Sequence, residues 1–341
     1  MLRASPIRFL LVLMFVGAFS VGAPAAELKK VPATRAFEKR FPEETVLLTY
    51  RRADGTVGVH AMGNRHVHAV ISLKRKSPAR QAIETAGEFV LSYPGENLEE
   101  PLRRCLEGAD VDLSPADVGL RTSPATEVKA PLPIGCIVSY ECTVRKEPVE
   151  TGDSMIFQGR IRATHRANVK ARRLYVMGYE DGSPILRPFG GARGLPAPRG
   201  HGKYPEQIAM IVSCNPEEKP NVMTAGWTMR VSDDPPMVAA FIGKSRFTHG
   251  RIESTDQFVY TYPGADMEHE MLYAGTHSGR NVDKFEVLDL ATSPADEVKP
   301  PLLTKALACF ECRVEEKIDR GSHTMFVGRV LAAHVNDKDV P

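Results

Sequence analysis

The residues best suited to chemistry gather in the second half of the chain, around its single tryptophan. The segment KPNVMTAGWTMRVSDDPP, residues 219–236, contains Trp227 and carries small or polar residues, including Asn221 and Thr224, where a core strand carries bulky ones. Small residues let a backbone approach a flat ring closely, and an indole can cover or wall such a ring. The segment therefore predicts room for the edge of a planar ligand, although a lone tryptophan also suits a core or an interface.

A second stretch, GKSRFTHGRI, is suited to binding a phosphate. It places Lys244, Ser245, Arg246 and Thr248 at the expected start of a helix. Free backbone N–H groups, the helix dipole and a basic pair all favour a phosphate at such a position. The alternative is a helix start that is simply solvated, as most charged runs are.

Two further sets of residues have side chains that can bind a metal. His60, His66 and His68 fall close together, but no carboxylate or cysteine is placed near them, and a structural zinc site needs such partners. Cys309 and Cys312 form a CxxC within an alternating segment. Residues three apart on a strand point to opposite faces, which favours ordinary buried thiols over a disulfide or shared metal ligation.

Composition is ordinary for a globular protein. The chain has 341 residues, 43% hydrophobic and 25% charged, with a formal net charge of +2. That charge gives no reason to expect nucleic acid or an anionic membrane as partner. The length favours two domains.

The chain repeats itself. SPATEVKAPL at 123–132 recurs as SPADEVKPPL at 293–302, with 8 of 10 positions identical, and GEFVLSYPG at 87–95 recurs as DQFVYTYPG at 256–264. A period of about 170 residues is that of a whole domain, far above the 20–50 residues of solenoid repeats. The sequence therefore predicts two tandem copies of one domain.

The copies are predicted to be barrels. A Gly-, Pro- and Arg-rich stretch, 189–203, reads as the linker between copy one, 27–188, and copy two, 204–341. Copy two shows six short strand-like segments (208–214, 220–229, 236–242, 257–263, 306–318 and 323–335) and two helix-like ones, near 245–248 and over 266–277. Many strands and few helices favour a closed or partly closed β-barrel.

The N-terminus predicts an exported protein. Arg3 and Arg8 precede the apolar run at 9–22, which is followed by an A-x-A site, as in a secretory signal. The apolar run falls short of the roughly 20 residues of a membrane span. We expect residues 1–26 to be a cleaved signal peptide and the mature protein to be periplasmic. An uncleaved anchor, or a misassigned start codon with a cytoplasmic protein, are the alternatives.

Copy two resembles the flavin reductase-like FMN-binding split-barrel family, and within it the flavoredoxin-like branch. The motifs NVMTAGW, DDPPMVAAFIGKSRFTHGRI, FVYTYPG, SGRNVDKFE, FECRV and GSHTMFVGRV carry the resemblance in order and spacing. It implies a mainly β fold of two split barrels packed as an intramolecular pseudo-dimer, with FMN at the interface. The family's flavin-contacting positions correspond to Asn221, Trp227, Thr248, Lys284 and His323.

Copy one resembles the family weakly and has lost these residue types, with Gly58 opposite Asn221, Asn64 opposite Trp227 and Ala79 opposite Thr248. The resemblance therefore implies one FMN, bound mainly by copy two and walled by copy one. The family also continues beyond Pro341 to a further flavin-proximal aromatic. We expect Tyr175, Tyr179 or Phe189, in the corresponding tail of copy one, to supply it.

The implied activity is oxidoreductase chemistry carried by the flavin. It would be NAD(P)H-dependent flavin reduction or flavoredoxin-like electron transfer to a partner protein. The alternative is a non-catalytic flavin-binding or structural module of the same fold.

Overall fold

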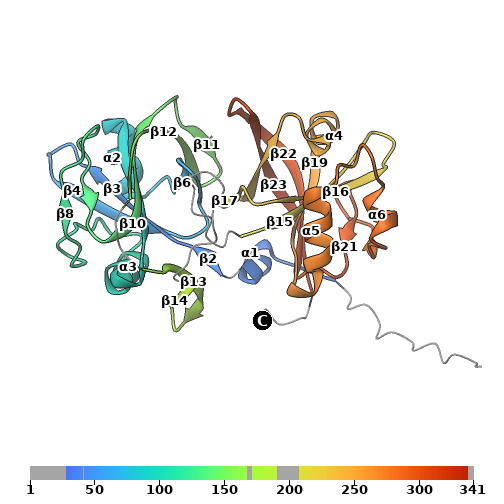
Figure 1. Ribbon diagram of the computed structural model, residues 1–341, viewed down its shortest axis with the longest axis horizontal. Helices are drawn as coiled ribbons and strands as arrows, with labels where there is room; N and C mark the ends of the chain where they lie inside the picture. Colours follow the sequence, from blue (N-terminus) through green and yellow to red (C-terminus); the bar gives the residue numbers. More distant parts are fainter. Residues whose placement is uncertain (1–27, 41, 167–170, 190–206, 337–341) are drawn as a thin grey trace, which may run out of the picture.

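The computed structural model describes residues 28–40, 42–166, 171–189 and 207–336. The predicted signal peptide and nearly all of the predicted linker lie outside the described residues. Met1 and Pro341 also lie outside the described residues. Figure 1 shows the two copies as two lobes side by side.

Copy one is built on an eight-stranded sheet with the order β4-β3-β7-β10-β12-β6-β5, to which β11 is added beside β12. Its strands are β3 (Val46–Arg51), β4 (Val57–Met62), β5 (His66–Val67), β6 (Val70–Lys74), β7 (Glu88–Pro94), β10 (Cys136–Val144), β11 (Val149–Thr151) and β12 (Ser154–Arg166). The other elements are β2 (Glu43–Glu44), α2 (Pro78–Ala86), α3 (Glu99–Glu107), β8 (Thr122–Ser123), β9 (Leu132–Pro133), β13 (Arg173–Glu180), β14 (Ser183–Phe189) and a short 3-10 turn, Glu96–Leu98.

Copy two repeats this order strand for strand, as β16-β15-β19-β22-β23-β18-β17. Its strands are β15 (Ala209–Cys214), β16 (Pro220–Ala225), β17 (Thr228–Asp233), β18 (Pro236–Gly243), β19 (Gln257–Tyr262), β22 (Ala308–Asp319) and β23 (His323–Val335). Its other elements are α4 (Phe247–Thr255), α5 (Glu268–Thr276), α6 (Lys284–Val287), β20 (Thr292–Ser293), β21 (Leu302–Leu303) and a 3-10 turn, Ala265–Met267. The mainly β fold of two tandem split barrels is confirmed.

The two cysteines of the CxxC lie in different core clusters, as the alternation of side chains along a strand predicts. Cys309 packs in a cluster with Met210 and Val259, whereas Cys312 packs in a separate cluster with Phe258 and Phe310. The two thiols of the CxxC thus face opposite sides of β22, as expected for residues three apart on a strand. All six cysteines are buried and free.

One strand prediction was wrong. Residues 220–229 do not form a single strand, because the chain breaks at Gly226 and Trp227 between β16 and β17. After the break, Trp227 O accepts a hydrogen bond from Phe241 N at 2.9 Å, which ties the tryptophan to β18. The break turns the indole out of the barrel, where it is 37% exposed.

The copies pack against each other through a shared apolar cluster. Val67, Val70 and Ile156 of copy one meet Met229 and Val231 of copy two in this cluster. Polar contacts complete the interface, since Ser72 Oγ donates to Val231 O at 2.6 Å. The two barrels therefore form the predicted intramolecular pseudo-dimer.

The N-terminal segment crosses to copy two. The strand β1 (Lys29–Val31) pairs with β23, and the helix α1 (Ala33–Phe37), which is followed by a 3-10 turn at Glu38–Arg40, lies against the same sheet (Figure 1). Phe37 is buried there and stacks on Phe310 with ring centroids 4.8 Å apart. These residues belong by contact to copy two, although the sequence pattern assigns 27–188 to copy one.

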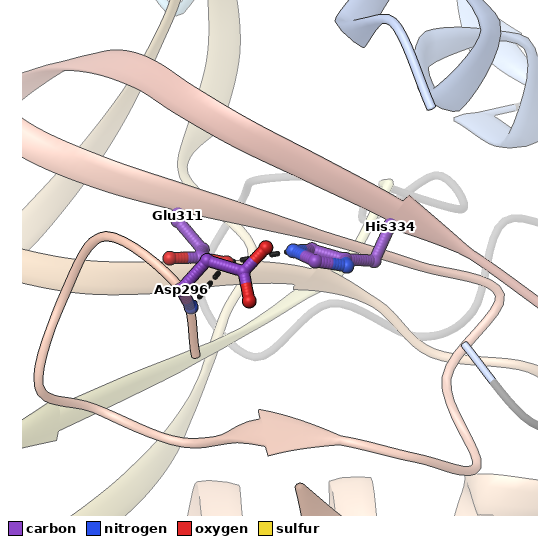
Figure 2. Close-up of side chains that lie close together, drawn as sticks. All are labelled: Asp296, Glu311 and His334. Carbon is purple, nitrogen blue, oxygen red and sulfur yellow. Dashed lines mark hydrogen bonds and ion pairs between the residues drawn. The ribbon is translucent and has the colours of Figure 1, made fainter. Parts of the chain in front are cut away.

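A buried carboxylate holds the SPADEVK loop in copy two. Glu311 accepts hydrogen bonds from Asp296 N at 3.0 Å and from His334 Nε2 at 2.6 Å (Figure 2). It also accepts one from Glu297 N at 2.5 Å. The three side chains of Figure 2 lie close enough to hold a metal ion. However, copy one builds the same arrangement from Glu141 and His165, with Thr126 in place of the aspartate. We interpret the cluster as a structural clamp that the duplication has kept.

We expect the contribution of the clamp to the stability of the protein to be lost in acid. Burial alone raises the pKa of Glu141, but the hydrogen bonds that it accepts from Thr126 and Glu127 outweigh burial and lower the pKa from 4.5 to about 2. A carboxyl group with a lowered folded pKa stabilises the protein above its unfolded pKa and loses that contribution as pH falls. We expect Glu141→Gln to lower the free energy of unfolding by about 1.5–3 kcal/mol at pH 7. That deficit should shrink between pH 4.5 and pH 2.

Urea unfolding at a series of pH values would measure this effect. The control is Glu127→Gln, which removes the same charge from an exposed neighbour and should leave stability within about 0.5 kcal/mol. A Glu141→Gln curve that stays parallel to that of the wild type in acid would contradict the clamp.

Candidate functional site

A polar cavity of about 330 Å³ lies in copy two, between the start of α4, the end of α5 and the strand β16. We call it the copy-two cavity. Its lining consists of Asn221, Met223, Thr224, Ser245, Arg246, Phe247, Thr248, Ala274, Gly275, Thr276, His277, Ser278, Gly279, Arg280 and Lys284. Six of the nine predicted site residues are among them. A second hollow of about 250 Å³ adjoins it and shares Asn221, Phe247, Gly279, Arg280 and Lys284.

The floor of the cavity is a buried polar pair from two elements. Asn221 on β16 donates from Nδ2 to Thr248 Oγ1 on α4 at 2.8 Å. Both residues are buried, so each satisfies a polar group that would otherwise be costly to bury. Gly279 packs directly on this pair, because a Cβ at that position would overlap Asn221 Oδ1 and lie 2.7 Å from the ring of Phe247. Only glycine allows the 275–280 loop to come this close.

Lys284 fixes the other side of the same loop. Its side chain is buried, and Nζ donates to Ala274 O at 3.1 Å and to His277 O at 3.0 Å. The lysine thereby ties α6 to the end of α5. Burial lowers the pKa of Lys284 from 10.5 to about 8.

This pKa gives a direct prediction. The Nζ resonance of Lys284 in the unliganded protein should titrate near pH 8 by NMR, whereas exposed lysines titrate near 10.4. The unfolded chain binds the proton more tightly than the folded protein, so stability should rise with pH between about 8 and 10.5. Lys284→Met should remove that rise. A titration above pH 10 would contradict the burial of a costly charge here.

The mouth of the cavity is positively charged. Arg246 is the residue before α4 and Arg280 lies on the facing loop, where its Nη1 donates to Ser245 O at 3.0 Å. The lining contains these two arginines and Lys284, and no carboxylate. The first turn of α4 has no side-chain cap, and it adds the positive end of a helix dipole. This set of donors suits an anionic group such as a phosphate.

Trp227 and His323 lie together beside this cavity rather than in its lining. Their ring centroids are 4.7 Å apart, and His68 of copy one meets the indole edge-on at 4.5 Å. Arg246 and His323 flank Gly243, because a Cβ there would lie 3.4 Å from Arg246 Cγ and 3.5 Å from His323 Nε2. Burial, and then the charge of Arg246, lower the pKa of His323. The aromatic wall thus adjoins the cationic mouth, and copy one contributes to it.

His68 owes its place to the short hairpin between β5 and β6. Val67 and Val70 pair across the turn and are buried in the shared cluster between the copies. His68 itself takes a φ of +50°, which residues other than glycine rarely adopt. The interface therefore holds the imidazole against Trp227.

The structure places some of the predicted residues outside the lining of the copy-two cavity. Lys244 does not line the cavity, because its Nζ pairs with Asp319 Oδ2 at 2.9 Å on the surface. Tyr175 is buried in copy one and Tyr179 lines a different cavity, so neither is among the residues that line the copy-two cavity. The side chain of Phe189 lies outside the described residues.

Sequence reasoning missed the 275–280 loop and Phe247. The motif SGRNVDKFE marks the loop, but glycine, serine and arginine in a turn carry no signal of their own. The sequence feature that could have indicated the loop is its short distance along the chain from Lys284, whose buried amine holds the loop in place.

The sequence comparisons identify the family of the chain. Residues 63–182 and 201–341 each match the family described as Flavin reductase like domain, and together they make up more than half of the chain. The chain belongs to the flavin reductase like domain family. The two matches fall on the two copies, which confirms both the resemblance and the duplication.

Two characterised reductases and one solved structure each match about two fifths of the chain, which is roughly the length of one copy. The NADH-dependent FAD reductase of Streptomyces globisporus is 29% identical over 136 residues, 40% of this chain and 72% of that protein. The FMN reductase (NADH) SmoA of Agrobacterium fabrum is 33% identical over 139 residues, 40% of this chain and 75% of that protein. The structure of flavoredoxin from Methanosarcina acetivorans is 29% identical and covers 38% of this chain and 68% of that chain, with a TM-score of 0.36. Among the described residues, no helix has the length and apolar character to cross a membrane.

Proposed function

We propose that copy two binds one FMN per chain and that the protein is an oxidoreductase, either an NAD(P)H-dependent flavin reductase or a flavoredoxin-like electron carrier. The observation that carries the proposal is the copy-two cavity, where Arg246, Arg280 and a helix start face one another with no carboxylate in the lining. The proposal also rests on membership of the flavin reductase like domain family.

The residues present fit this cofactor. The cavity of about 330 Å³, with its adjoining hollow of about 250 Å³, falls within the usual range for small-molecule sites of roughly 300–1,000 Å³. Ser245, Arg246, Arg280 and the first turn of α4 would hold the phosphate. Asn221, Thr224 and Thr248 offer donors and acceptors further in. Trp227, His323 and His68 would wall the ring.

The protein's part in the chemistry is to bind and orient. A bound flavin would supply the redox step, taking a hydride from a nicotinamide or passing electrons to a partner protein. Positive charge from Arg246 and Lys284 would favour the more electron-rich state of the cofactor. Gly279 and the Asn221–Thr248 pair would fix the floor, so that little reorganisation accompanies binding.

Copy one is unsuited to a second flavin. A Cβ at Gly58, the position that matches Asn221, would overlap the ring of Tyr50, so Tyr50 occupies the space that the asparagine has in copy two. Ala79 replaces Thr248, and the exposed carboxylate of Asp110 replaces Gly279. A carboxylate at the matching mouth would repel a phosphate.

A visible spectrum tests the proposal. Protein reconstituted with FMN should be yellow, and anaerobic NADH or NADPH should bleach it if the protein is a flavin reductase. Bleaching by dithionite but by neither nicotinamide would favour the electron carrier or the non-catalytic flavin-binding module. Protein that takes up no FMN at micromolar concentrations would overturn the flavin proposal.

Export remains a separate proposal that rests on the sequence alone. The segment 1–26 has the charge and apolar pattern of a cleavable signal peptide. Expression of the full chain with a C-terminal tag should yield periplasmic protein that begins near residue 27. Cytoplasmic protein with the intact N-terminus would contradict it.

A further inference from the structure

In copy two, the N-terminal segment of the chain covers the outer edge of β23. The strand β1 pairs with the last three residues of β23, and Lys29 stands opposite Val335. Phe37 of α1 lies on the adjoining face of the sheet, in one core cluster with Val330 and Phe310. Copy two therefore contains a groove that an extended segment fills, made of a strand edge beside an aromatic face.

The matching edge is open in copy one. β12 is the counterpart of β23, and within the described part of the chain its residues 160–166 pair with β10 alone. Ile161 is 41% exposed, whereas its counterpart Val330 is 7% exposed. Tyr140 is half-buried where Phe310 is fully buried. We call residues 160–166 and Tyr140 the copy-one groove. An open strand edge beside an apolar face is a template for a further strand.

The charge of this groove is reversed between the copies. In copy two, Lys30 of β1 pairs with Asp296 at 2.9 Å. Copy one has Thr126 in place of Asp296, and the exposed Arg166 in place of Val335. A segment that begins with two lysines, as β1 does, would meet like charge in copy one. A segment that begins with carboxylates would meet opposite charge.

The rest of the edge has the same sign. Arg162 is exposed and replaces Leu331, so it too makes the copy-one groove more positive than its counterpart. Residues 160–166 contain no acid. The carboxylate of Glu141 on β10 is fully buried and accepts hydrogen bonds from Thr126 and His165, so it does not face an incoming segment.

We propose that the copy-one groove is a docking site for an acidic, extended segment of a partner protein. The segment pairs with the end of β12 as β1 pairs with β23, and it places a carboxylate opposite Arg166 and an aromatic ring on Tyr140. Backbone pairing supplies affinity, and the charge and the ring supply specificity. This proposal is independent of whether copy two binds a flavin.

A peptide derived from the chain itself tests the chemistry of the groove. The probe has the sequence of residues 29–37 with Lys29, Lys30 and Arg35 replaced by glutamate, and it carries a fluorophore for anisotropy measurements with the full chain. We expect it to bind at least tenfold more tightly than the unsubstituted peptide. Phe37→Ala in the acidic peptide should weaken binding at least fivefold, because the ring that would lie on Tyr140 is lost.

A charge reversal in the protein tests the assignment to β12. Arg166→Glu should weaken binding of the acidic peptide at least fivefold and strengthen binding of the unsubstituted peptide, because an attractive cross-strand pair becomes a repulsive one. The matched control is Arg329→Glu. It makes the same change of charge at an exposed position on β23 and should alter the affinity less than twofold.

NMR locates the peptide. A spin label on the acidic peptide should broaden the amide resonances of Ile161 and Thr164. Broadening at Arg246 and Arg280 instead would place the peptide at the cationic mouth of copy two and overturn the proposal. Equal binding of the acidic and basic peptides would overturn it as well. So would no binding of either, since the arginines would then only protect an open edge from pairing.

Discussion

Replacing Arg246 and Arg280 together by alanine should weaken FMN binding about a thousandfold. Each arginine would give a charge-assisted hydrogen bond to the phosphate, worth about 1.5–3 kcal/mol, and each 1.4 kcal/mol is a factor of ten in affinity. Arg280 also holds the carbonyl of Ser245 in place. The dissociation constant can be measured by quenching of flavin fluorescence in wild type and variant.

Riboflavin supplies the control for this result, because it has the same ring and no phosphate. Its affinity should change by no more than about threefold in the double variant. An equal loss for FMN and riboflavin would mean that the variant is misfolded or that the arginines contact the ring. No loss of affinity for either flavin would mean that the phosphate does not bind in this cavity.

Gly279→Ala should reduce the affinity for both FMN and riboflavin by about a hundredfold. The added Cβ would overlap Asn221 Oδ1 and press on Phe247, which must shift the floor of the cavity or the 275–280 loop. Overpacking of this kind costs about 1–3 kcal/mol, and here the distortion falls on the ligand site. The affinity for both flavins falls because the substitution changes the floor of the cavity and leaves its charged mouth unchanged.

Gly250→Ala is the matched control for Gly279→Ala. Gly250 lies in α4 close to the same cavity, and a Cβ there would meet nothing within 4 Å. Alanine in a helix is favoured over glycine by about 0.5–1 kcal/mol, so this variant should be slightly more stable and bind FMN normally. Normal flavin binding by Gly279→Ala would show that the cavity has another occupant.

The sequence predicts most of the barrel because its strands are short, alternating and separated by turn residues. The sequence predicts strands over 323–335, which is β23, and over 257–263, which corresponds to β19. The prediction of a single strand over 220–229 is wrong at Gly226 and Trp227. The alternating pattern continues without interruption across the break between β16 and β17, so it does not mark the break. Sequence reasoning failed also for α1 and Phe37, since no local pattern shows which copy a terminal segment will cover.

The site was predictable where chemistry and spacing coincide. Arg246 and Thr248 lie at a helix start that the sequence predicts. Asn221 lies on a strand whose side chains are smaller and more polar than those of a core strand. Gly279 and Arg280 depend instead on how a loop folds back over β16, which is a long-range contact. The role of His68 depends on the pairing of the two copies, which a single chain segment does not encode.

We propose that the copy-two cavity, and not its counterpart in copy one, holds one FMN. A crystal structure of the protein soaked with FMN would show where the flavin lies. We expect one flavin per chain, with its phosphate against Arg246 and Arg280 and its ring beside Trp227. Flavin in copy one, in both copies, or at neither cavity would contradict it.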